Sequence, residues 1–242
     1  MRSKISNRFY ILSLTLFIFS TIHTPACKAQ AGVGVKLSIT DKYKLYKEQV
    51  QQDSTKKMVE LKTLMPGLKY DLRYATINNF MHRLMYPQNT NITFLRLPAA
   101  MALQKVQQEL NEKGLGLKIF DAYRPYSVTV KFWELIKDER YVANPAKGSG
   151  HNRGIAVDLT IINLKTTEEL NMGTGFDNFT DMAHQTFTHL PEEVLQNRHL
   201  LKSTMEKYGF VALETEWWHY FLVNDEKFEV LDIDFKKLKK NL

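Results

Sequence analysis

The chain has 242 residues, of which 44% are hydrophobic and 12% aromatic. This length and composition predict one compact domain with a sizeable core and leave little room for a second domain. The formal net charge of +7 would suggest a nucleic-acid partner, but Arg2, Lys4, Arg8 and Lys28 fall in an N-terminal segment that we expect to be removed. Without these four residues the net charge is +3. That value is ordinary for a protein surface, so we predict no nucleic-acid partner.

The N-terminal segment has the pattern of an export signal. Its basic residues precede an apolar run over residues 9–22, and the small-residue stretch 24–31 follows. The apolar run is shorter than the roughly 20 residues that a membrane-spanning helix needs. We therefore predict a signal peptide over residues 1–29, no transmembrane segment in the mature protein, and a periplasmic location.

Cys27 is the single cysteine of the chain, which excludes an intramolecular disulfide. Cleavage after Ala29 or Ala31 would leave the mature protein without a thiol, which excludes thiol catalysis. A lipoprotein signal would place a larger aliphatic residue three positions before the cysteine, where this chain has Thr24. Simple cleavage is therefore favoured, and a lipid anchor at Cys27 is the alternative.

The mature chain divides into three regions by composition. Residues 30–59 are expected to form a leader or linker, whose polar stretch 42–57 is typical of a short helix. Residues 60–235 are expected to form the folded domain, and residues 236–242 a basic tail. The sequence makes no prediction of an oligomeric state.

Helical and strand patterns alternate irregularly along the domain. We expect helices beginning at Pro98, Pro125 and Pro191, and strands over 117–122, 154–162, 210–213 and 217–223. The segment 163–190 lacks periodicity and is expected to form a loop over the functional site. These elements predict an α+β single domain in which a central, mainly antiparallel sheet carries the metal site and is packed with helices.

The strand 154–162 contains a carboxylate, Asp158, on the same face as Ala156 and Thr160. A carboxylate in the middle of a buried strand is costly unless it is paired or bound to a cation. His151 lies just upstream in a glycine-flanked loop that could fold back toward Asp158. Taken alone, these two residues are better explained by a solvated histidine and a salt bridge.

A second acid and a second imidazole occur in Glu216-Trp-Trp-His219. Catalytic zinc is typically held by three protein ligands with a fourth position open to water. Two imidazoles and one carboxylate favour zinc over other divalent metals. We therefore predict one zinc ion per chain, held by His151, Asp158 and His219; the alternative for Glu216 is a buried acid in an aromatic core.

Glu216 and His219 can share one site only if the chain turns between them, because residues three apart lie on opposite faces of a flat strand. We therefore place Glu216 in the turn that enters the last strand. There it could take a proton from water and deliver it to the leaving amine. A closed structural zinc site would not need this carboxylate.

Arg124 lies in Asp121-Ala-Tyr-Arg-Pro125, at the end of a predicted strand. A guanidinium at this place could point into a cleft and stabilise the oxyanion of a tetrahedral intermediate. An arginine at a strand end is more often part of a surface ion pair, and the sequence alone leaves both interpretations open.

Several motifs of the chain are those of a known family. Residues 149–158 have the form SxHxxGxAxD, and residues 216–219 have the form ExxH. Together these motifs resemble the D-alanyl-D-alanine dipeptidases, zinc enzymes of vancomycin-resistance clusters that are related to D,D-carboxypeptidases and to the hedgehog signalling domain. Further matches are residues 70–80, 121–125 and the Met-Gly-Thr-Gly-Phe-Asp segment 172–177. The resemblance runs from about residue 60 to residue 225.

This resemblance implies that His151, Asp158 and His219 bind zinc, that Glu216 is the catalytic base, and that Arg124 stabilises the transition state. It also implies that Asp177 pairs with the free amino group of the substrate and that Ser149 contacts the substrate. The implied reaction is the hydrolysis of D-Ala-D-Ala to two D-alanines by a zinc-activated water. A small D-amino dipeptide is thus the expected partner.

Two other functions stay open from the sequence. The first is a peptidoglycan D,D-carboxypeptidase or endopeptidase of the same metal group, which would need an open groove and would lack the amino clamp at Asp177. The second is a zinc-stabilised module that binds wall peptides without cleaving them. The presence of both Glu216 and Arg124 argues against the second function.

Overall fold

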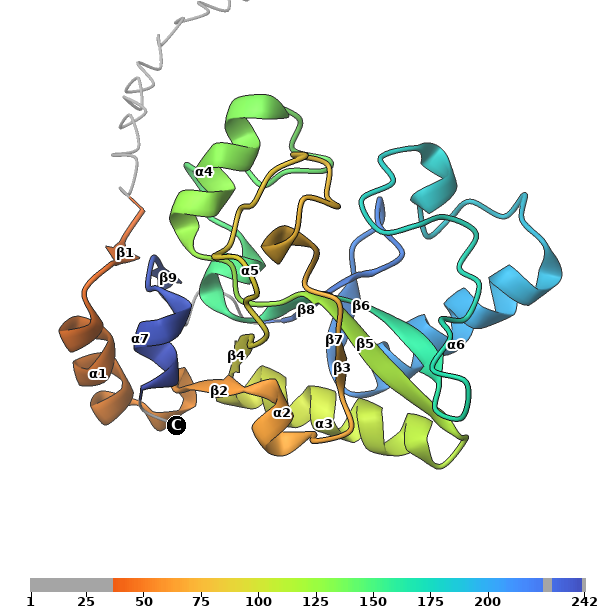
Figure 1. The fold of residues 1–242 in the computed structure, drawn as a ribbon, viewed down its shortest axis with the longest axis horizontal. Helices are drawn as coiled ribbons and strands as arrows, with labels where there is room; N and C mark the ends of the chain where they lie inside the picture. Colours follow the sequence, from red (N-terminus) through yellow and green to blue (C-terminus); the bar gives the residue numbers. More distant parts are fainter. Residues whose placement is uncertain (1–36, 224–227, 241–242) are drawn as a thin grey trace, which may run out of the picture. The chain divides into compact units, whose positions relative to one another are not determined.

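The computed structural model describes residues 37–223 and 228–240 (Figure 1). The predicted signal peptide and Cys27 lie outside the described residues. Within the described ranges, no helix has both the length and the apolar character needed to cross a membrane.

A five-stranded sheet forms the centre of the fold. Its strands, in spatial order, are β3 (Lys69–Tyr70), β5 (Leu115–Asp121), β6 (Ala156–Asn163), β8 (His219–Leu222) and β7 (Phe210–Ala212). Neighbouring strands are antiparallel except for the parallel pair β3 and β5. The predicted α+β domain with a mainly antiparallel sheet is confirmed.

The two longest helices pack against this sheet. Helix α3 (Leu97–Asn111) contacts β5, α6 (Glu192–Lys207) contacts β7, and the two helices contact each other. Each begins beside a proline, as expected, because a proline fits the first helical turn, where no N–H partner is needed. Gly114 and Gly209 follow the two helices with φ angles of +71° and +89°, a left-handed conformation that glycine adopts without strain.

Strand β6 is the central strand, and its residues from Ala156 to Ile162 are all buried. Both of its faces are therefore covered, which explains the nearly continuous apolar sequence around Asp158 and Thr160. The segment 164–190 after β6 contains one short 3₁₀ helix, η3 (Asp181–Ala183), and otherwise forms the expected loop.

Short elements complete the fold. They are η1 (Ser54–Lys56), β2 (Met58–Glu60), α2 (Leu61–Leu64), η2 (Arg73–Ala75), β4 (Phe94–Arg96), α4 (Tyr126–Leu135) and α5 (Gly150–Arg153). Strands β2 and β4 form an antiparallel pair. Helix α4 begins after Pro125, as the sequence predicts.

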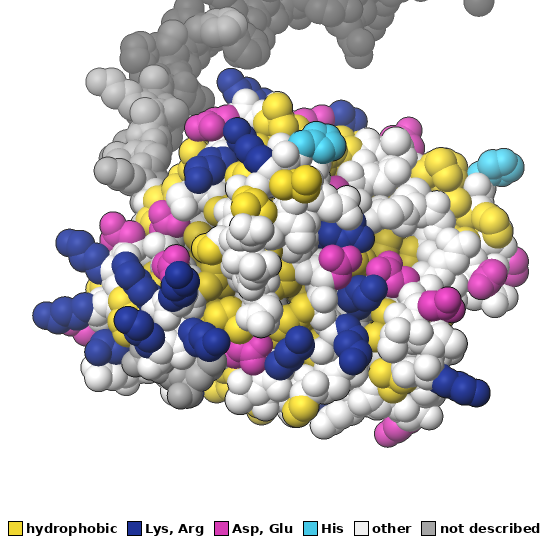
Figure 2. All heavy atoms as spheres, viewed as in Figure 1, with side chains coloured by type: hydrophobic (Ala, Val, Ile, Leu, Met, Phe, Trp, Pro, Cys, Tyr) yellow, Lys and Arg dark blue, Asp and Glu magenta, His cyan; other side chains and the backbone are white. Residues whose placement is uncertain are grey.

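The region expected to be a leader pairs with the C-terminal end of the expected domain. Strand β1 (Ile39–Thr40) runs parallel to β9 (Val230–Leu231), and each is followed by a helix, α1 (Tyr43–Gln52) or α7 (Phe235–Lys239). The polar stretch thus contains a short helix, as expected. Figure 2 shows lysine and arginine side chains gathered on the side of the molecule where these helices lie.

Candidate metal centre and its pocket

His151 lies on the one-turn helix α5, not in the open loop that the sequence suggested. Ser149 caps this helix: its hydroxyl accepts a hydrogen bond from the Asn152 N–H, and the Asn152 side chain accepts one from the Ser149 N–H. Gly154 ends the turn with a φ angle of +73°. The capping box fixes the direction in which the His151 ring points.

The other two expected ligands are direct neighbours in the sheet. Asp158 on β6 stands opposite His219 on β8 in the strand register. Cross-strand partners have neighbouring side chains on one face of a sheet. Residues 61 positions apart in the sequence are thereby brought into contact.

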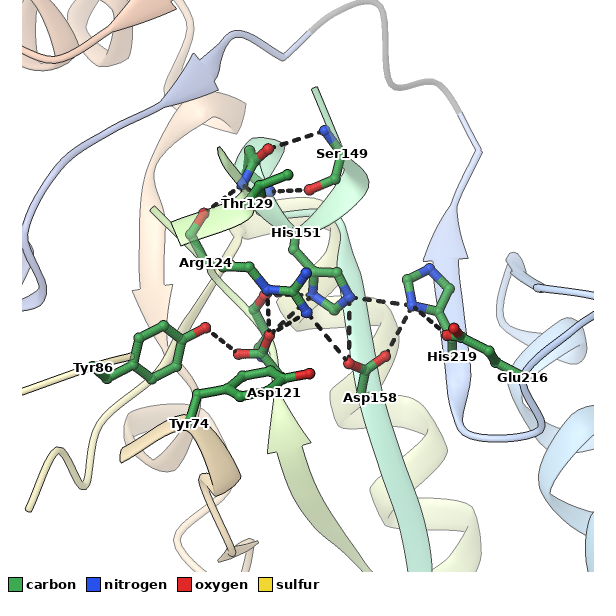
Figure 3. Close-up of polar contacts among 12 residues, drawn as sticks. Tyr74, Tyr86, Asp121, Arg124, Thr129, Ser149, His151, Asp158, Glu216 and His219 are labelled. Carbon is green, nitrogen blue, oxygen red and sulfur yellow. Dashed lines mark hydrogen bonds and ion pairs between the residues drawn. The ribbon is translucent and has the colours of Figure 1, made fainter. Parts of the chain in front are cut away.

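His151, Asp158 and His219 offer ligand atoms that all lie within 4.8 Å of one another. Asp158 Oδ1 is 2.9 Å from His219 Nδ1, and His151 Nε2 is 3.1 Å from the same nitrogen (Figure 3). His151 Nδ1 lies 2.7 Å from the carbonyl oxygen of Ala122, so it carries the proton and leaves Nε2 free as a ligand. Two imidazole nitrogens and a carboxylate converging in this way fit a divalent metal ion such as zinc.

Electrostatic interactions and burial keep Asp158 and His219 in the protonation states that bind a cation. Burial would raise the pKa of Asp158, but His151 and His219 hold it well below its usual value. Burial lowers the pKa of His219, which favours the neutral imidazole. An ionised carboxylate beside a neutral imidazole is the state that a metal ion requires of its ligands.

Glu216 lies in the turn that enters β8, where the sequence placed it. The His219 N–H donates to the Glu216 carbonyl oxygen at 3.3 Å, and the Glu216 carboxylate is 3.9 Å from His219 Nδ1. Burial, followed by the charges of Asp158 and Asp177, raises the pKa of Glu216 well above its ordinary value. A raised pKa makes the carboxylate of Glu216 a stronger base than an ordinary carboxylate.

Arg124 is buried and points toward Asp158 from the end of β5. Its Nη2 is 2.8 Å from Asp121 Oδ2 and 3.8 Å from Asp158 Oδ2. Burial would lower the pKa of Arg124, but the charge of Asp121 and neighbouring groups raise it well above its ordinary value. The guanidinium also lies over the rings of Phe132 and Tyr74. It is therefore held in one orientation, unlike an arginine of a surface ion pair.

Asp177 lies across the pocket on the long loop. Its Oδ1 accepts a hydrogen bond from the Tyr74 hydroxyl at 3.0 Å, while its Oδ2 is buried and has no hydrogen-bond partner among the described residues. Burial, with a contribution from Asp158, raises the pKa of Asp177 to about 8. A buried carboxylate oxygen without a partner is suited to a cationic group of a ligand.

These residues share one cavity of about 280 Å³. Its lining includes the metal ligands together with Arg124, Ser149, Asp177 and Glu216, and aromatic side chains form much of the remaining wall: Tyr74, Phe80, Phe132, Tyr141, Phe179, Trp218 and Phe221. Every residue that the sequence singled out for the site therefore borders the same space.

Comparison with known proteins shows to which family the chain belongs. A sequence profile described as D-ala-D-ala dipeptidase, of the peptidase M15 group, matches residues 54–238. The chain belongs to the D-Ala-D-Ala dipeptidase family. The matched range extends the resemblance seen in the motifs at both ends.

Individual dipeptidases of this family are also similar to the chain over most of its length. The chain is 34% identical to the D-alanyl-D-alanine dipeptidase of Escherichia coli over 181 residues, which are 75% of this chain and 92% of the relative. It is 31% identical to the Enterococcus faecalis dipeptidase, over 68% of this chain and 91% of that one. It is 30% identical to the Streptomyces coelicolor dipeptidase, over 66% of this chain and 88% of that one. The match covers nearly the whole length of each relative.

The dipeptidase site also contains residues that sequence reasoning missed. Asp121 binds both Nε and Nη2 of Arg124 and accepts a hydrogen bond from the Tyr86 hydroxyl. Asn152 donates to the Arg124 carbonyl oxygen and to Thr129 Oγ1. The Asp-x-x-Arg spacing could have indicated the first pair, because side chains three apart meet where a strand turns into a helix.

Proposed function

We propose that this member of the family is a zinc metallopeptidase that hydrolyses D-Ala-D-Ala to two D-alanines. The observation that carries the proposal is the convergence of three candidate metal ligands with Glu216, Arg124 and Asp177 around one pocket. Zinc, held by His151, Asp158 and His219, would act as a Lewis acid that polarises a carbonyl group and acidifies water.

Glu216 moves the proton in the proposed reaction. Its carboxylate takes the proton of the attacking water and later returns it to the nitrogen of the leaving D-alanine. The raised pKa of Glu216 supports this role, since a carboxyl with an ordinary pKa would be too weak a base. Protonation of the nitrogen lets the second D-alanine leave as an amine.

Arg124 stabilises the negative charge that develops on the carbonyl oxygen. The hydrogen bond and the ion pair with Asp121 fix the guanidinium before the substrate arrives, so little reorganisation is needed during the reaction. Arg124 faces the pocket on the same side as the metal ligands (Figure 3).

Asp177 and Ser149 are assigned to substrate binding. Asp177 receives the ammonium group through its unpartnered Oδ2, and the resulting charge-assisted contact favours a free dipeptide over the end of a polymer. Ser149 borders the pocket at the start of α5 and contacts the substrate there. A D,D-carboxypeptidase would have no use for a buried anion at this position.

The export signal predicted over residues 1–29 suggests where this activity acts. An enzyme outside the cytoplasm would meet dipeptide released from the cell wall or present in the environment. We therefore propose a periplasmic enzyme that serves scavenging or wall turnover, with a lipid anchor at Cys27 as the alternative to free release.

Release of D-alanine by the purified mature protein tests the proposal. We expect D-Ala-D-Ala to be cleaved, the activity to disappear with a chelator, and zinc to restore it. Absence of cleavage by zinc-loaded, folded protein would refute the dipeptidase assignment and leave a binding module. Activity that survives complete metal removal would refute the zinc assignment.

A further inference from the structure

The loop that carries Asp177 has no regular structure of its own to hold it. Between β6 and α6 the described chain contains the 3₁₀ turn η3 and a single bridge from Glu169 to Ile162, and neither includes Asp177. Asp177 nevertheless has a defined position, with its side chain bound to Tyr74 and its φ angle at +60°. Contacts from outside the loop must therefore fix it.

Arg198 on α6 supplies the first of these contacts. Its buried guanidinium donates from Nε to the Met172 carbonyl oxygen and from Nη2 to the Met182 carbonyl oxygen, both at 2.8 Å. Met172 and Met182 lie five residues before and five residues after Asp177. One side chain thus joins the two arms of the loop.

Arg198 makes no salt bridge to a carboxylate within the described residues, and burial lowers its pKa. Its third contact is also to a backbone oxygen, that of His184, at 3.2 Å. The Arg198 guanidinium therefore binds backbone carbonyl oxygens of the loop and holds them close together. Gly173 permits the close approach of α6, since an added Cβ would lie 2.9 Å from Val194 Cγ1.

Trp217 supplies the second contact, and it follows Glu216 directly in the sequence. Its indole Nε1–H donates to the Thr174 hydroxyl at 2.8 Å, and its backbone N–H donates to the Ala183 carbonyl oxygen at 3.0 Å. These acceptors again lie on the two sides of Asp177. The turn that carries the proposed base is therefore joined to the loop that carries the proposed ammonium acceptor.

We propose that Arg198 and the Trp217–Thr174 hydrogen bond are positioning groups that fix Asp177 relative to Glu216 and so determine the preference for a free amino terminus. This inference rests on the proposed dipeptidase function. Neither Arg198 nor Trp217 lines the pocket, so both act through Asp177. If Asp177 loses this position, it binds the ammonium group less tightly. The loss of binding free energy is the same for the bound substrate and for the transition state, so KM rises and kcat stays nearly unchanged.

Steady-state kinetics of the zinc-loaded enzyme on D-Ala-D-Ala tests the inference. Trp217→Phe keeps an aromatic side chain at this position and removes the indole N–H, and Thr174→Val removes the matching hydroxyl. We expect each to raise KM by about tenfold with kcat within about twofold. The KM of the double variant, Trp217→Phe with Thr174→Val, should be no higher than that of either single variant. Trp133→Phe is the matched control, because Trp133 lies on α4 outside the pocket, and it should leave KM unchanged.

A cycle with Asp177→Asn separates positioning from general damage to the fold. In the Asp177→Asn background, Trp217→Phe should change KM by less than about twofold, because the group it positions has lost its charge. Arg198→Lys should raise KM in the same way. Thermal unfolding of this variant should show that the protein stays folded.

Two results would overturn the inference. One is a fall in kcat at constant KM in the Trp217 and Thr174 variants, and the other is an equal effect of Trp217→Phe with and without Asp177. Wild-type enzyme that fails to cleave the dipeptide would instead remove the proposed function together with this inference.

Discussion

Glu216 is the residue on which the proposed chemistry depends most. Replacing it with glutamine removes the proton acceptor but keeps the size of the side chain, so we expect kcat to fall by about 10²–10⁴-fold. Zinc content should stay near one ion per chain, as measured by metal analysis of the purified variant. Glu214→Gln, an exposed neighbour in the same turn, is the control and should keep full activity. Retained turnover in Glu216→Gln would remove the carboxylate from the mechanism.

Arg124 should be required for turnover but not for metal binding. Arg124→Ala removes a preorganised donor to the oxyanion, which is typically worth about 3–4 kcal/mol, or roughly 10²–10³-fold in kcat. Metal analysis should show unchanged zinc. Arg140→Ala, at an exposed ion pair with Asp138, serves as the control. A loss smaller than about tenfold for Arg124→Ala would contradict the assigned role.

Asp177 should make the stability of the metal-free protein depend on pH. Its pKa is about 8 in the fold and near 3.8 in the unfolded chain, so between these values the folded state holds one more proton. The free energy of unfolding should therefore fall as pH rises from 4 to 8, by up to about 1.4 kcal/mol per pH unit from this group. In Asp177→Asn this contribution disappears, and chemical denaturation across the range should give a flatter profile. Identical profiles would contradict a raised pKa of the buried Asp177 carboxyl.

Which single residues meet at the site was partly predictable from the sequence. Histidine and carboxylate spacing predicted the ligand set, and the ExxH spacing required the turn at Glu216 that the structure contains. Asp121 was missed because its partner Arg124 can be recognised as buried only when the covering rings of Tyr74 and Phe132 are known. Burial by distant segments leaves no local pattern in the sequence.

At the scale of elements, α5 shows what local patterns can miss. A four-residue helix is too short for any hydrophobic period, so His151 was expected in a loop. The Ser-x-x-Asn spacing of its capping box was nevertheless readable at residues 149–152. Strands β1 and β9 were missed for another reason, since two-residue strands about 190 positions apart depend entirely on tertiary packing.

Gly154 tests the importance of the α5 turn. Its φ angle is +73°, and an added Cβ would lie 2.7 Å from Met58 Cε and 3.3 Å from Arg96 Cγ. We expect Gly154→Ala to lower the free energy of unfolding by about 1–3 kcal/mol and to weaken zinc binding, because His151 lies on this turn. Gly67→Ala, where no atom lies within 4 Å of the added Cβ, is the control for denaturant unfolding. Equal stability of the two variants would show that the turn tolerates a side chain.

At the scale of the whole molecule, the candidate metal centre brings together residues of β6, β8 and α5. A ligand that binds only the folded state stabilises it according to its concentration and affinity. Zinc should therefore raise the Tm of the chelator-treated protein, and the rise should be lost in His219→Ala. Calorimetry with and without zinc measures this directly. An unchanged Tm in the wild-type protein would argue against a metal site at these residues.

The central claim is that the pocket containing Asp177 selects a free dipeptide, and a competition between two substrates tests it most directly. The ratio of kcat/KM for D-Ala-D-Ala to that for a stem pentapeptide ending in D-Ala-D-Ala should be measured with the zinc-loaded protein. We predict a ratio far above one in the wild-type enzyme and a reduced ratio in Asp177→Asn. Preferential cleavage of the pentapeptide would contradict the account and place the protein among the carboxypeptidases of the same metal group.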